Sequence, residues 1–214
     1  MHPLLPVACV LATFGDRQGV VHPLMVHTPI SVILVMSGRT YSERRHAIRS
    51  TWAKDASNVY FMIGQPSCHI PPSYRRSPWA CVRKDPSHRV PIQVQIAHDK
   101  LMVKELDELR VERERHRDII LLPMVDAYRD LALKLKLSYE WALKHTTARW
   151  LVKTDDDNYI RPHGLNRWLR KIPSSGYTMI AGSFSRGGSV DRSGKWRERG
   201  YKGPSTWPPY PSGA

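Results

Sequence analysis

The sequence predicts an α/β domain in which helices flank a mainly parallel sheet. Short apolar runs alternate along the chain with segments of helical periodicity, which is the order that a parallel sheet requires. Three consecutive aspartates, Asp155 to Asp157, directly follow one apolar run, and parallel sheets carry their functional groups at such strand ends. With 214 residues, of which 41% are hydrophobic, the chain is long enough for one sizeable domain with a real core.

Five apolar runs predict the strands. Turn-forming residues bound them, such as Ser37 and Gly38 after the first run and Gly64 after the second. Residues 1–29 show no sustained period, so we expect a poorly determined leader there and regular structure from Ile30 onward, in a domain that spans 30–214. The strands are expected at residues 30–36, 59–63, 118–122, 150–152 and 179–184.

Four segments predict the helices that join these strands. Ser42 can cap the first helix, and Met102, Leu106 and Leu109 share one face of the second. The third carries two apolar stripes, one of them through Leu135, so we expect it to be buried on both sides. The helices are expected at residues 42–52, about 100–115, about 127–144 and 164–171.

The balance of charge indicates an anionic partner. The formal net charge is +14 and the sequence pI is about 10.0. Nucleic acid, a phosphorylated small molecule, an acidic glycan or an anionic membrane would each fit this charge. No apolar run approaches the roughly 20 residues that span a bilayer, and no segment has the basic start and apolar middle of a signal peptide.

The aspartate triplet is the strongest candidate for a functional site. At a strand end, alternate side chains project to the same side, so Asp155 and Asp157 can face one ligand while Asp156 points elsewhere. Two hard oxygen donors at this spacing suit Mg²⁺ or Mn²⁺, whose remaining positions phosphate oxygens can fill. The competing interpretation is an acidic turn, or a helix N-cap, before Arg161 and Pro162.

Four strings of residues follow one another in the order of a known family. Glu43–Trp52 is similar to R-x-x-I-R-x-T-W, and Phe61–Gly64 is similar to F-x-x-G. Asp126–Lys134 is similar to D-x-Y-x-N-L-T-x-K, and Lys153–Asp157 matches K-x-D-D-D. These strings, in order within residues 30–214, resemble the motifs of the β-1,3-glycosyltransferases of glycosyltransferase family 31.

The resemblance implies a GT-A-like, Rossmann-type fold, a UDP-GalNAc or UDP-Gal donor, a Mn²⁺ cofactor and inversion at the anomeric carbon. It implies Asp157 as a direct metal ligand, with Asp155 binding the metal through water or holding the ribose. The nucleotide-sugar site that it implies comprises Arg44, Arg49, Asp126, Lys134, Lys153, Asp155 and Asp156. The alternative roles are structural: ion-paired arginines on a helix, an Asp–Lys pair that fixes a helix against the sheet, and a lysine that only pairs with the aspartates.

Two subgroups of the family share features with this chain, and the GalNAc-adding subgroup resembles it more closely. Residues 190–196 and the loop from Cys68 to Cys81 are similar to the subgroup that adds GalNAc to the GlcNAc of O-mannosyl glycans. Residues 117–123 and 194–198 are similar to the subgroup that adds galactose in the proteoglycan linker. The acceptor is therefore expected to be a glycan on a glycoprotein or proteoglycan, while the donor sugar stays open between GalNAc, Gal and GlcNAc.

The resemblance also implies a location and a limit on activity. It implies a type II membrane protein of the Golgi or endoplasmic reticulum lumen, although we see no anchor in these residues, and in that oxidising lumen a disulfide between Cys68 and Cys81 is plausible. Residues 207–214 resemble the family segment Y-P-x-Y-x-x-G-x-G-Y, and the sequence stops inside it. Because the family's E-D motif with the catalytic base would follow, we assign no base, expect a domain incomplete at its C-terminus, and expect transfer to be inactive or impaired.

Two other functions stay open. A basic module could bind nucleic acid through residues 110–117 and 195–202, but no helix-turn-helix, zinc-finger or RNP pattern supports it, so we expect no nucleic-acid partner. A folded but non-catalytic remnant could bind UDP and metal without turnover. Metal-dependent UDP binding would favour the transferase ancestry, whereas salt-sensitive RNA binding without metal dependence would favour the basic module.

Overall fold

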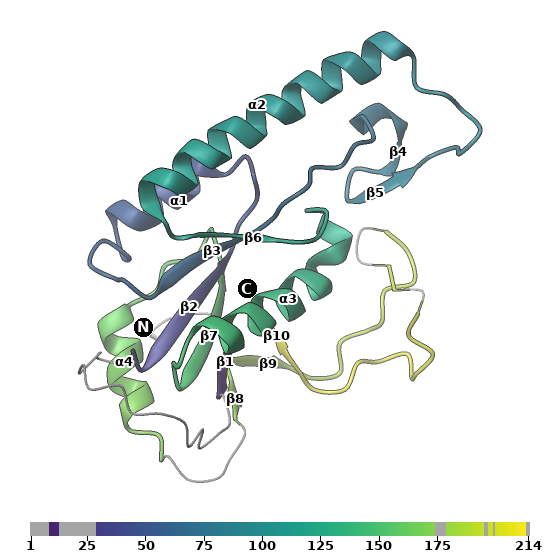
Figure 1. The fold of residues 1–214 in the computed structure, drawn as a ribbon. Helices are drawn as coiled ribbons and strands as arrows, with labels where there is room; N and C mark the ends of the chain where they lie inside the picture. Colours follow the sequence, from purple (N-terminus) through teal and green to yellow (C-terminus); the bar gives the residue numbers. More distant parts are fainter. Residues whose placement is uncertain (1–8, 13–28, 174–178, 195–196, 199, 213–214) are drawn as a thin grey trace.

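The computed structural model describes residues 9–12, 29–173, 179–194, 197–198 and 200–212. Most of the leader lies outside the described residues, as do residues 195–196, 199 and 213–214, on which parts of the resemblances above depend. A six-stranded sheet of order β6-β3-β2-β7-β1-β8 forms the centre of the molecule (Figure 1). Its strands are β1 Cys9–Ala12, β2 Ser31–Met36, β3 Val59–Gly64, β6 Ile119–Leu122, β7 Trp150–Asp155 and β8 Ile180–Ala181.

The sheet is mainly parallel, which confirms the predicted α/β class. β2 pairs in parallel with both β3 and β7, and β3 pairs in parallel with β6. β1 runs antiparallel between β7 and β8. The register of β2 on β7 pairs Ser31 with Trp150 and Met36 with Asp155, so the first aspartate of the triplet lies beside the carboxyl end of β2.

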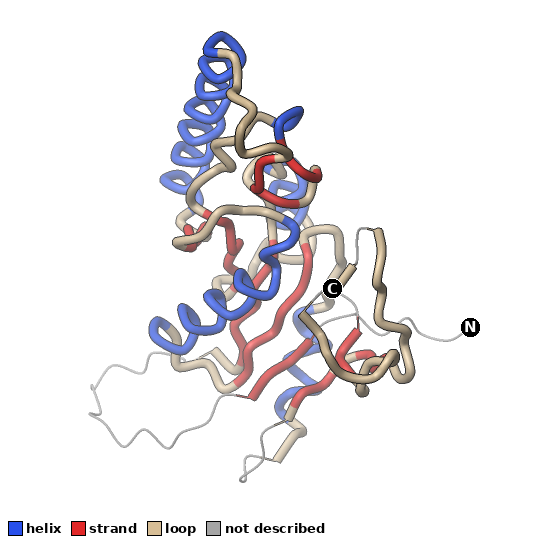
Figure 2. The backbone as a smooth tube through the Cα atoms, turned by 90° about the vertical axis from the view of Figure 1, so that its right-hand side faces the viewer, coloured by secondary structure: helices blue, strands red, loops and turns tan. Residues whose placement is uncertain are grey.

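Helices cover both faces of this sheet (Figure 2). The helices are α1 Ser42–Ser50, α2 Ile92–His116, α3 Leu131–His145 and α4 Pro162–Arg170. The smaller elements are the 3₁₀ helices η1 Pro72–Tyr74 and η2 Tyr128–Asp130 and the strands β4 Arg75–Ser77, β5 Ala80–Arg83, β9 Ser183–Ser185 and β10 Tyr210–Ser212. β4 pairs with β5, and β9 pairs with β10, so each pair forms a separate small sheet.

Alternation along β2 explains why the core has two halves. Ile33 and Val35 pack with α1, α2 and α4 on one face, whereas Val32 and Leu34 pack with α3 on the other. All four side chains are buried, because a parallel strand inside such a sheet is covered on both sides. The continuous apolar run from residue 30 to 36 reflects this double burial.

Two expectations about the strands are wrong in part. Regular structure does not begin at Ile30, because residues 9–12 form β1 in the central sheet. β1 pairs with β7 and β8, which are distant in sequence, so no local periodicity predicts this strand. The single strand expected at 179–184 is divided into β8 and β9, which belong to different sheets.

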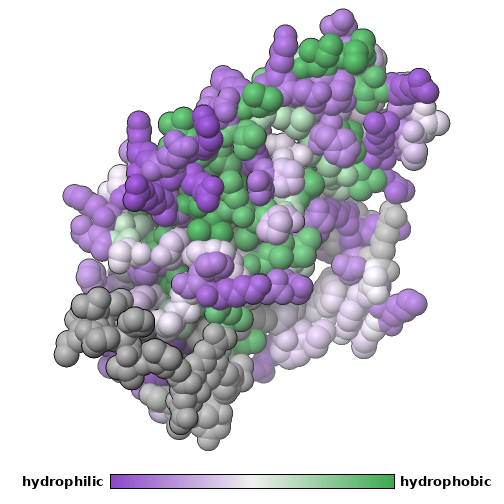
Figure 3. Space-filling model, in the orientation of Figure 1, coloured by the Kyte–Doolittle hydropathy of each residue, from purple (hydrophilic) through white to green (hydrophobic). Residues whose placement is uncertain are grey.

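The two longest helices are also placed differently from the expectation. α2 begins at Ile92, and its amino-terminal part extends beyond the sheet, where Figure 3 shows apolar surface in green. Leu109 packs against the sheet and is 2% exposed, whereas Leu106, one turn earlier, is 44% exposed, so the predicted apolar face is buried only in part. α3 is buried along one side only, through Lys134, Ser138 and Ala142, because within the described residues no further layer covers its outer side. Within the same part of the chain, no helix has the length and apolar character needed to cross a membrane.

Candidate functional site

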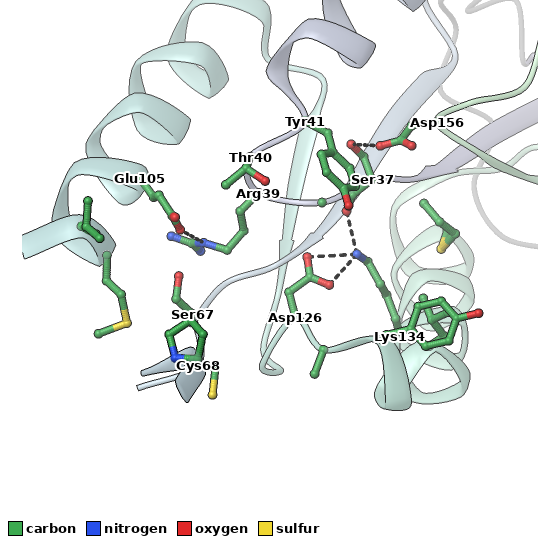
Figure 4. A pocket seen from close by; sticks show the side chains of 18 of the residues that line it. Ser37, Arg39, Thr40, Tyr41, Ser67, Cys68, Glu105, Asp126, Lys134 and Asp156 are labelled. Carbon is green, nitrogen blue, oxygen red and sulfur yellow. Dashed lines mark hydrogen bonds and ion pairs between the residues drawn. The ribbon is translucent and has the colours of Figure 1, made fainter. Parts of the chain in front are cut away.

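A cleft of about 590 Å³ lies where the four parallel strands end. The residues that follow each strand line it: 37–41 after β2, 67–68 after β3, 126–128 after β6 and 155–157 at the end of β7. Figure 4 shows side chains from these segments converging on one space. The carboxyl edge of a parallel sheet is where α/β proteins bind their ligands, so this cleft is the first candidate for a functional site.

The three aspartates have different surroundings in this cleft. Asp156 is buried, and its carboxylate accepts hydrogen bonds from Ser37 Oγ at 2.7 Å and from Arg44 at 2.8 Å. The side chains of Asp155 and Asp157 are 40% and 65% exposed, respectively. The outer two carboxylates are therefore accessible to a ligand, while the middle one holds the end of β7 against β2 and α1.

The accessible carboxylates already face cations of the protein. Lys153 Nζ lies 2.9 Å from Asp155, and the Arg44 guanidinium lies 3.5 Å from Asp157. The hydrogen bond to Asp156 raises the pKa of Arg44, so this side chain stays charged. A cation bound at the triplet must therefore share its carboxylates with Arg44 and Lys153.

The donor set fits a divalent cation that is bound together with phosphate. No group of three His, Cys, Asp or Glu side chains in the described part of the chain is arranged to hold a metal by itself. Asp155 and Asp157 supply two carboxylates, and sites for small hard cations often use one or two carboxylates together with substrate phosphates and water. The residues present are compatible with such a shared site.

Arg49 is not brought to the cleft. Its guanidinium donates to Asp118 at 2.7 and 2.8 Å and to Glu112 at 2.7 Å. Burial alone would lower the pKa of Arg49, but the bonds to Asp118 and Glu112 outweigh burial and raise it. Glu112 also accepts two bonds from Arg45, whose side chain is fully buried. The structure thus uses Arg49 in an ion-pair network that joins α1, α2 and the start of β6.

Asp126 and Lys134 line the cleft and bind each other. Lys134 is 3% exposed, and its Nζ donates to Asp126 at 2.8 and 3.1 Å and to the carbonyl of Ser37 at 2.7 Å. Asp126 also accepts the backbone N–H of Gly64 at 3.2 Å. A Cβ on Gly64 would lie 2.8 Å from Asp126, so only glycine allows this approach. The pair therefore fixes α3 against the ends of β2 and β3 and forms part of the cleft wall.

Sequence reasoning missed Arg39 and Ser67, which also line the cleft. The guanidinium of Arg39 donates to the carbonyls of Gly64 and Gln65, and its Nε lies 4.0 Å from Glu105 of α2. Burial lowers the pKa of Arg39, although Glu105 opposes this shift. Arg39 Nε and Ser67 Oγ are buried without a hydrogen-bond partner among the described residues, and both residues line the cleft. No sequence signal marked them, since Glu105 is distant in sequence and Ser67 lies in a segment read only as loop.

A disulfide closes the side of the cleft next to α2. Cys68 and Cys81 are joined at an S–S distance of 2.09 Å, and Cys68 lines the cleft. Arg75 donates from Nε to the carbonyl of Ile70 at 2.7 Å, and a ring nitrogen of His98 lies 2.8 Å from the carbonyl of Cys68. The loop between the two cysteines is thus tied both covalently and by hydrogen bonds.

A mainly parallel sheet flanked by helices, with carboxylates at its carboxyl edge, is consistent with a GT-A-like glycosyltransferase domain. The chain belongs to the galactosyltransferase family, since the model of that family matches residues 76–214. This family is the class that the four sequence strings resembled.

Curated relatives carry related names. Residues of this chain are 34% identical over 110 positions to the UDP-GalNAc:beta-1,3-N-acetylgalactosaminyltransferase 2 of Homo sapiens, covering 51% of this chain and 22% of that protein. They are 27% identical over 186 positions to the Beta-1,3-galactosyltransferase 6 of Mus musculus, covering 85% of this chain and 48% of that protein. The chain thus spans about a fifth to a half of the length of these relatives.

Proposed function

We propose that this chain is the nucleotide-sugar-binding part of an inverting β-1,3-hexosyltransferase that transfers GalNAc or Gal from a UDP-sugar to a glycan acceptor. The observation that carries this proposal is the pair of accessible carboxylates, Asp155 and Asp157, in the cleft where four parallel strands end. Membership of the galactosyltransferase family supports the same reaction.

We propose that Asp157 holds a divalent cation, Mn²⁺, directly and that Asp155 assists it. When bound, such a cation supplies positive charge to the diphosphate that leaves as the glycosidic bond breaks. Arg44 lies 3.5 Å from the carboxylate of Asp157, and Lys153 lies 2.9 Å from that of Asp155. These two cations partly neutralise the charge repulsion between the carboxylates. Asp156 has a structural role in this proposal, because its hydrogen bonds with Ser37 and Arg44 fix the end of β7.

The remaining cleft residues bind the nucleotide in this proposal. Asp126 and Lys134 form a wall of fixed shape, and Arg39 Nε and Ser67 Oγ, which make no hydrogen bond within the described residues, can donate to oxygens of the ligand. Arg49 contributes only by fixing α1, which carries Arg44. The nucleotide-sugar site is therefore built by Arg44, Asp126, Lys134, Lys153, Asp155 and Asp156, with Arg39 and Ser67 added.

The finer identity of donor and acceptor is also a proposal. The relatives include proteins named for GalNAc transfer and for Gal transfer, so both UDP-sugars are donors to test. The resemblance of the Cys68–Cys81 loop to the O-mannosyl subgroup makes a GlcNAc-terminated O-mannosyl glycan the first acceptor. A Cys68–Cys81 disulfide fits an oxidising lumen, such as that of the endoplasmic reticulum or Golgi.

Calorimetric titration with UDP, UDP-GalNAc and UDP-Gal, with and without Mn²⁺, tests the binding half of this proposal. We expect binding that requires the metal and that involves the uridine diphosphate of both donors. Release of UDP in the presence of GlcNAc- or Gal-terminated acceptors tests the transfer half. Because no catalytic base is assigned, we expect metal-dependent binding with little or no release from this chain. Rapid metal-dependent release would show that a base lies among the residues present, and the absence of metal-dependent binding would contradict the proposal.

A further inference from the structure

A second pocket lies outside the candidate nucleotide site, in the segment 72–90, which we call the basic loop. This loop comprises η1, the β4–β5 hairpin and the turn that leads into α2. It contains five Arg or Lys residues against one acidic residue, Asp85. The excess of positive charge is therefore concentrated in a short part of the chain.

The pocket has a volume of about 320 Å³. Arg83, Lys84 and His88 line it together with Ser73, Tyr74 and Asp85. The rings of Tyr74 and His88 lie 5.9 Å apart, and the N–H of Lys84 donates to the carbonyl of Tyr74 at 2.9 Å. These contacts hold η1 and the turn after the hairpin around a shared space that is large enough for a sugar ring or a sulfate group.

Two cations of this pocket are not neutralised by the part of the chain that the structure describes. Arg83 and Lys84 are exposed, and within the described residues neither makes an ion pair. The nearby carboxylate of Asp85 accepts instead from the N–H and the hydroxyl of Ser87, at 2.9 and 2.7 Å. Arg39, Arg44, Arg45 and Arg49 near the first cleft are all paired, so the basic loop differs from that cleft in presenting cations without an ion-pair partner among the described residues.

The hairpin places two arginines directly opposite each other. Arg75 pairs with Arg83 across β4 and β5, and like charges in directly opposed positions destabilise a two-stranded ribbon. Arg75 turns away to the carbonyl of Ile70, which leaves Arg83 to the pocket. Arg83 is therefore an exposed cation that lines the pocket and makes no ion pair within the described residues, which suits it to bind an anion.

The pocket adjoins the candidate nucleotide cleft. Pro72 and Arg75 line the cleft, whereas Ser73 and Tyr74 between them line the pocket, so the single turn η1 separates the two. A ligand long enough to cross that turn can occupy both spaces. The disulfide from Cys68 to Cys81 ties this loop and favours an oxidising compartment, in which acidic glycans are abundant and nucleic acid is not the expected polyanion.

We propose that the basic loop binds an acidic glycan, with Arg83 and Lys84 contacting its sulfate or carboxylate groups. The inference rests on the proposed function, because a glycosyltransferase with a glycan acceptor favours a glycan over other polyanions. It adds a charged subsite next to the proposed nucleotide cleft and does not change the role of the aspartates.

The test compares two double variants that remove the same charge. R83A/K84A removes two cations of the pocket, and R110A/R113A removes two exposed cations from α2. The probe is a heparin-derived octasaccharide, titrated by calorimetry into the full chain at fixed salt. We expect R83A/K84A to bind it about tenfold more weakly and R110A/R113A to bind it within about twofold of the unmodified chain.

Equal losses in the two variants would overturn the proposal, because binding would then follow net charge and not this pocket. A single-stranded RNA of matched charge that binds more tightly than the octasaccharide, with the same loss in R83A/K84A, would also overturn it in favour of a nucleic-acid site. Mn²⁺-dependent UDP binding is measured on the same samples. It should be unchanged in R83A/K84A, so failure of the glycan site is distinguished from failure of the nucleotide site.

Discussion

Asp155, Asp156 and Asp157 are neighbours in sequence, yet each has its own partner in the structure. Asp156 is 7% exposed and bonded to Ser37, while the carboxylates on either side of it are accessible. Alternation at the strand end was enough to predict this division from sequence. The partners were not predictable, since Ser37 is 119 residues away from Asp156 and meets it only through the pairing of β2 with β7.

This division predicts that Asp157→Asn affects mainly ligand binding, whereas Asp156→Asn affects mainly stability. Asp157→Asn should weaken Mn²⁺-dependent UDP binding by at least about tenfold with little change in stability, because loss of groups that serve a metal site commonly costs about 10- to 100-fold. Asp107→Asn, at an exposed position of α2, is the matched control and should bind normally. Calorimetry gives the affinity, and equal titration curves for Asp157→Asn and the unmodified chain would contradict the assignment.

Asp156→Asn should act on the fold first. Its buried carboxylate holds Ser37 and Arg44, so its replacement should lower the free energy of unfolding by about 1–3 kcal/mol. Urea denaturation measures this loss. A normal denaturation midpoint combined with lost UDP binding would instead make Asp156 a direct ligand contact.

At the scale of elements, α1 is held to α2 by charge. Arg45 and Arg49 lie one helical turn apart on α1, and both bind Glu112 of α2. The family string that contains these arginines implied a nucleotide-binding role for Arg49. Its ion-pair partner Glu112 could not be predicted, because it lies 63 residues away in sequence and no local pattern identifies it. The sequence predicted a helix over residues 42–52, but only the packing of α2 determines which side chains its arginines contact.

Glu112→Gln should strongly destabilise the domain. It would leave the fully buried Arg45 without a countercharge, and removal of one partner from a buried ion pair costs about 3–5 kcal/mol. Glu114→Gln, on the exposed side of the same helix, should cost little. Urea denaturation of the two variants provides the comparison, and similar midpoints would show that the network does not stabilise the fold.

The burial of α2 predicts a second contrast between matched substitutions. Leu109→Ala should cost about 2–5 kcal/mol, because Leu109 is 2% exposed and packs in the core against the sheet. Leu106→Ala removes the same atoms at a position that is 44% exposed and should cost much less. Chemical denaturation measures both losses. Equal losses would mean that both leucines lie on one buried face, as periodicity alone suggested.

At the scale of the whole molecule, stability should depend on pH through Glu112. Burial alone would raise the pKa of Glu112, but hydrogen bonds from Arg45 and Arg49 outweigh burial and lower it below the ordinary value of 4.5. The stability that this carboxylate contributes is therefore complete above pH 4.5 and is lost as the pH falls through the lower folded pKa. The free energy of unfolding should fall below that pH in the unmodified chain and fall less in Glu112→Gln. A steeper fall in the variant would contradict the network.

The overall architecture was largely predictable, and its exceptions share one cause. Apolar runs predicted β2, β3, β6 and β7, because strands covered on both faces have continuous apolar sequences. β1 and the division of β8 from β9 were not predictable, because long-range pairing determines them. The cleft formed at the predicted edge, but the contributions of Arg39, Ser67 and Glu105 to it required the three-dimensional packing.

The central claim is that a divalent cation at the end of β7 joins the protein to a nucleotide diphosphate. Anomalous diffraction from a crystal of the chain grown with Mn²⁺ and UDP tests it most directly. The account predicts one manganese peak bonded to the Asp157 carboxylate at about 2.1 Å, shared with oxygens of the diphosphate and lying in the cleft beside Ser37 and Asp155. A diphosphate bound in the cleft without manganese at Asp157, or manganese bound away from the triplet, would contradict it.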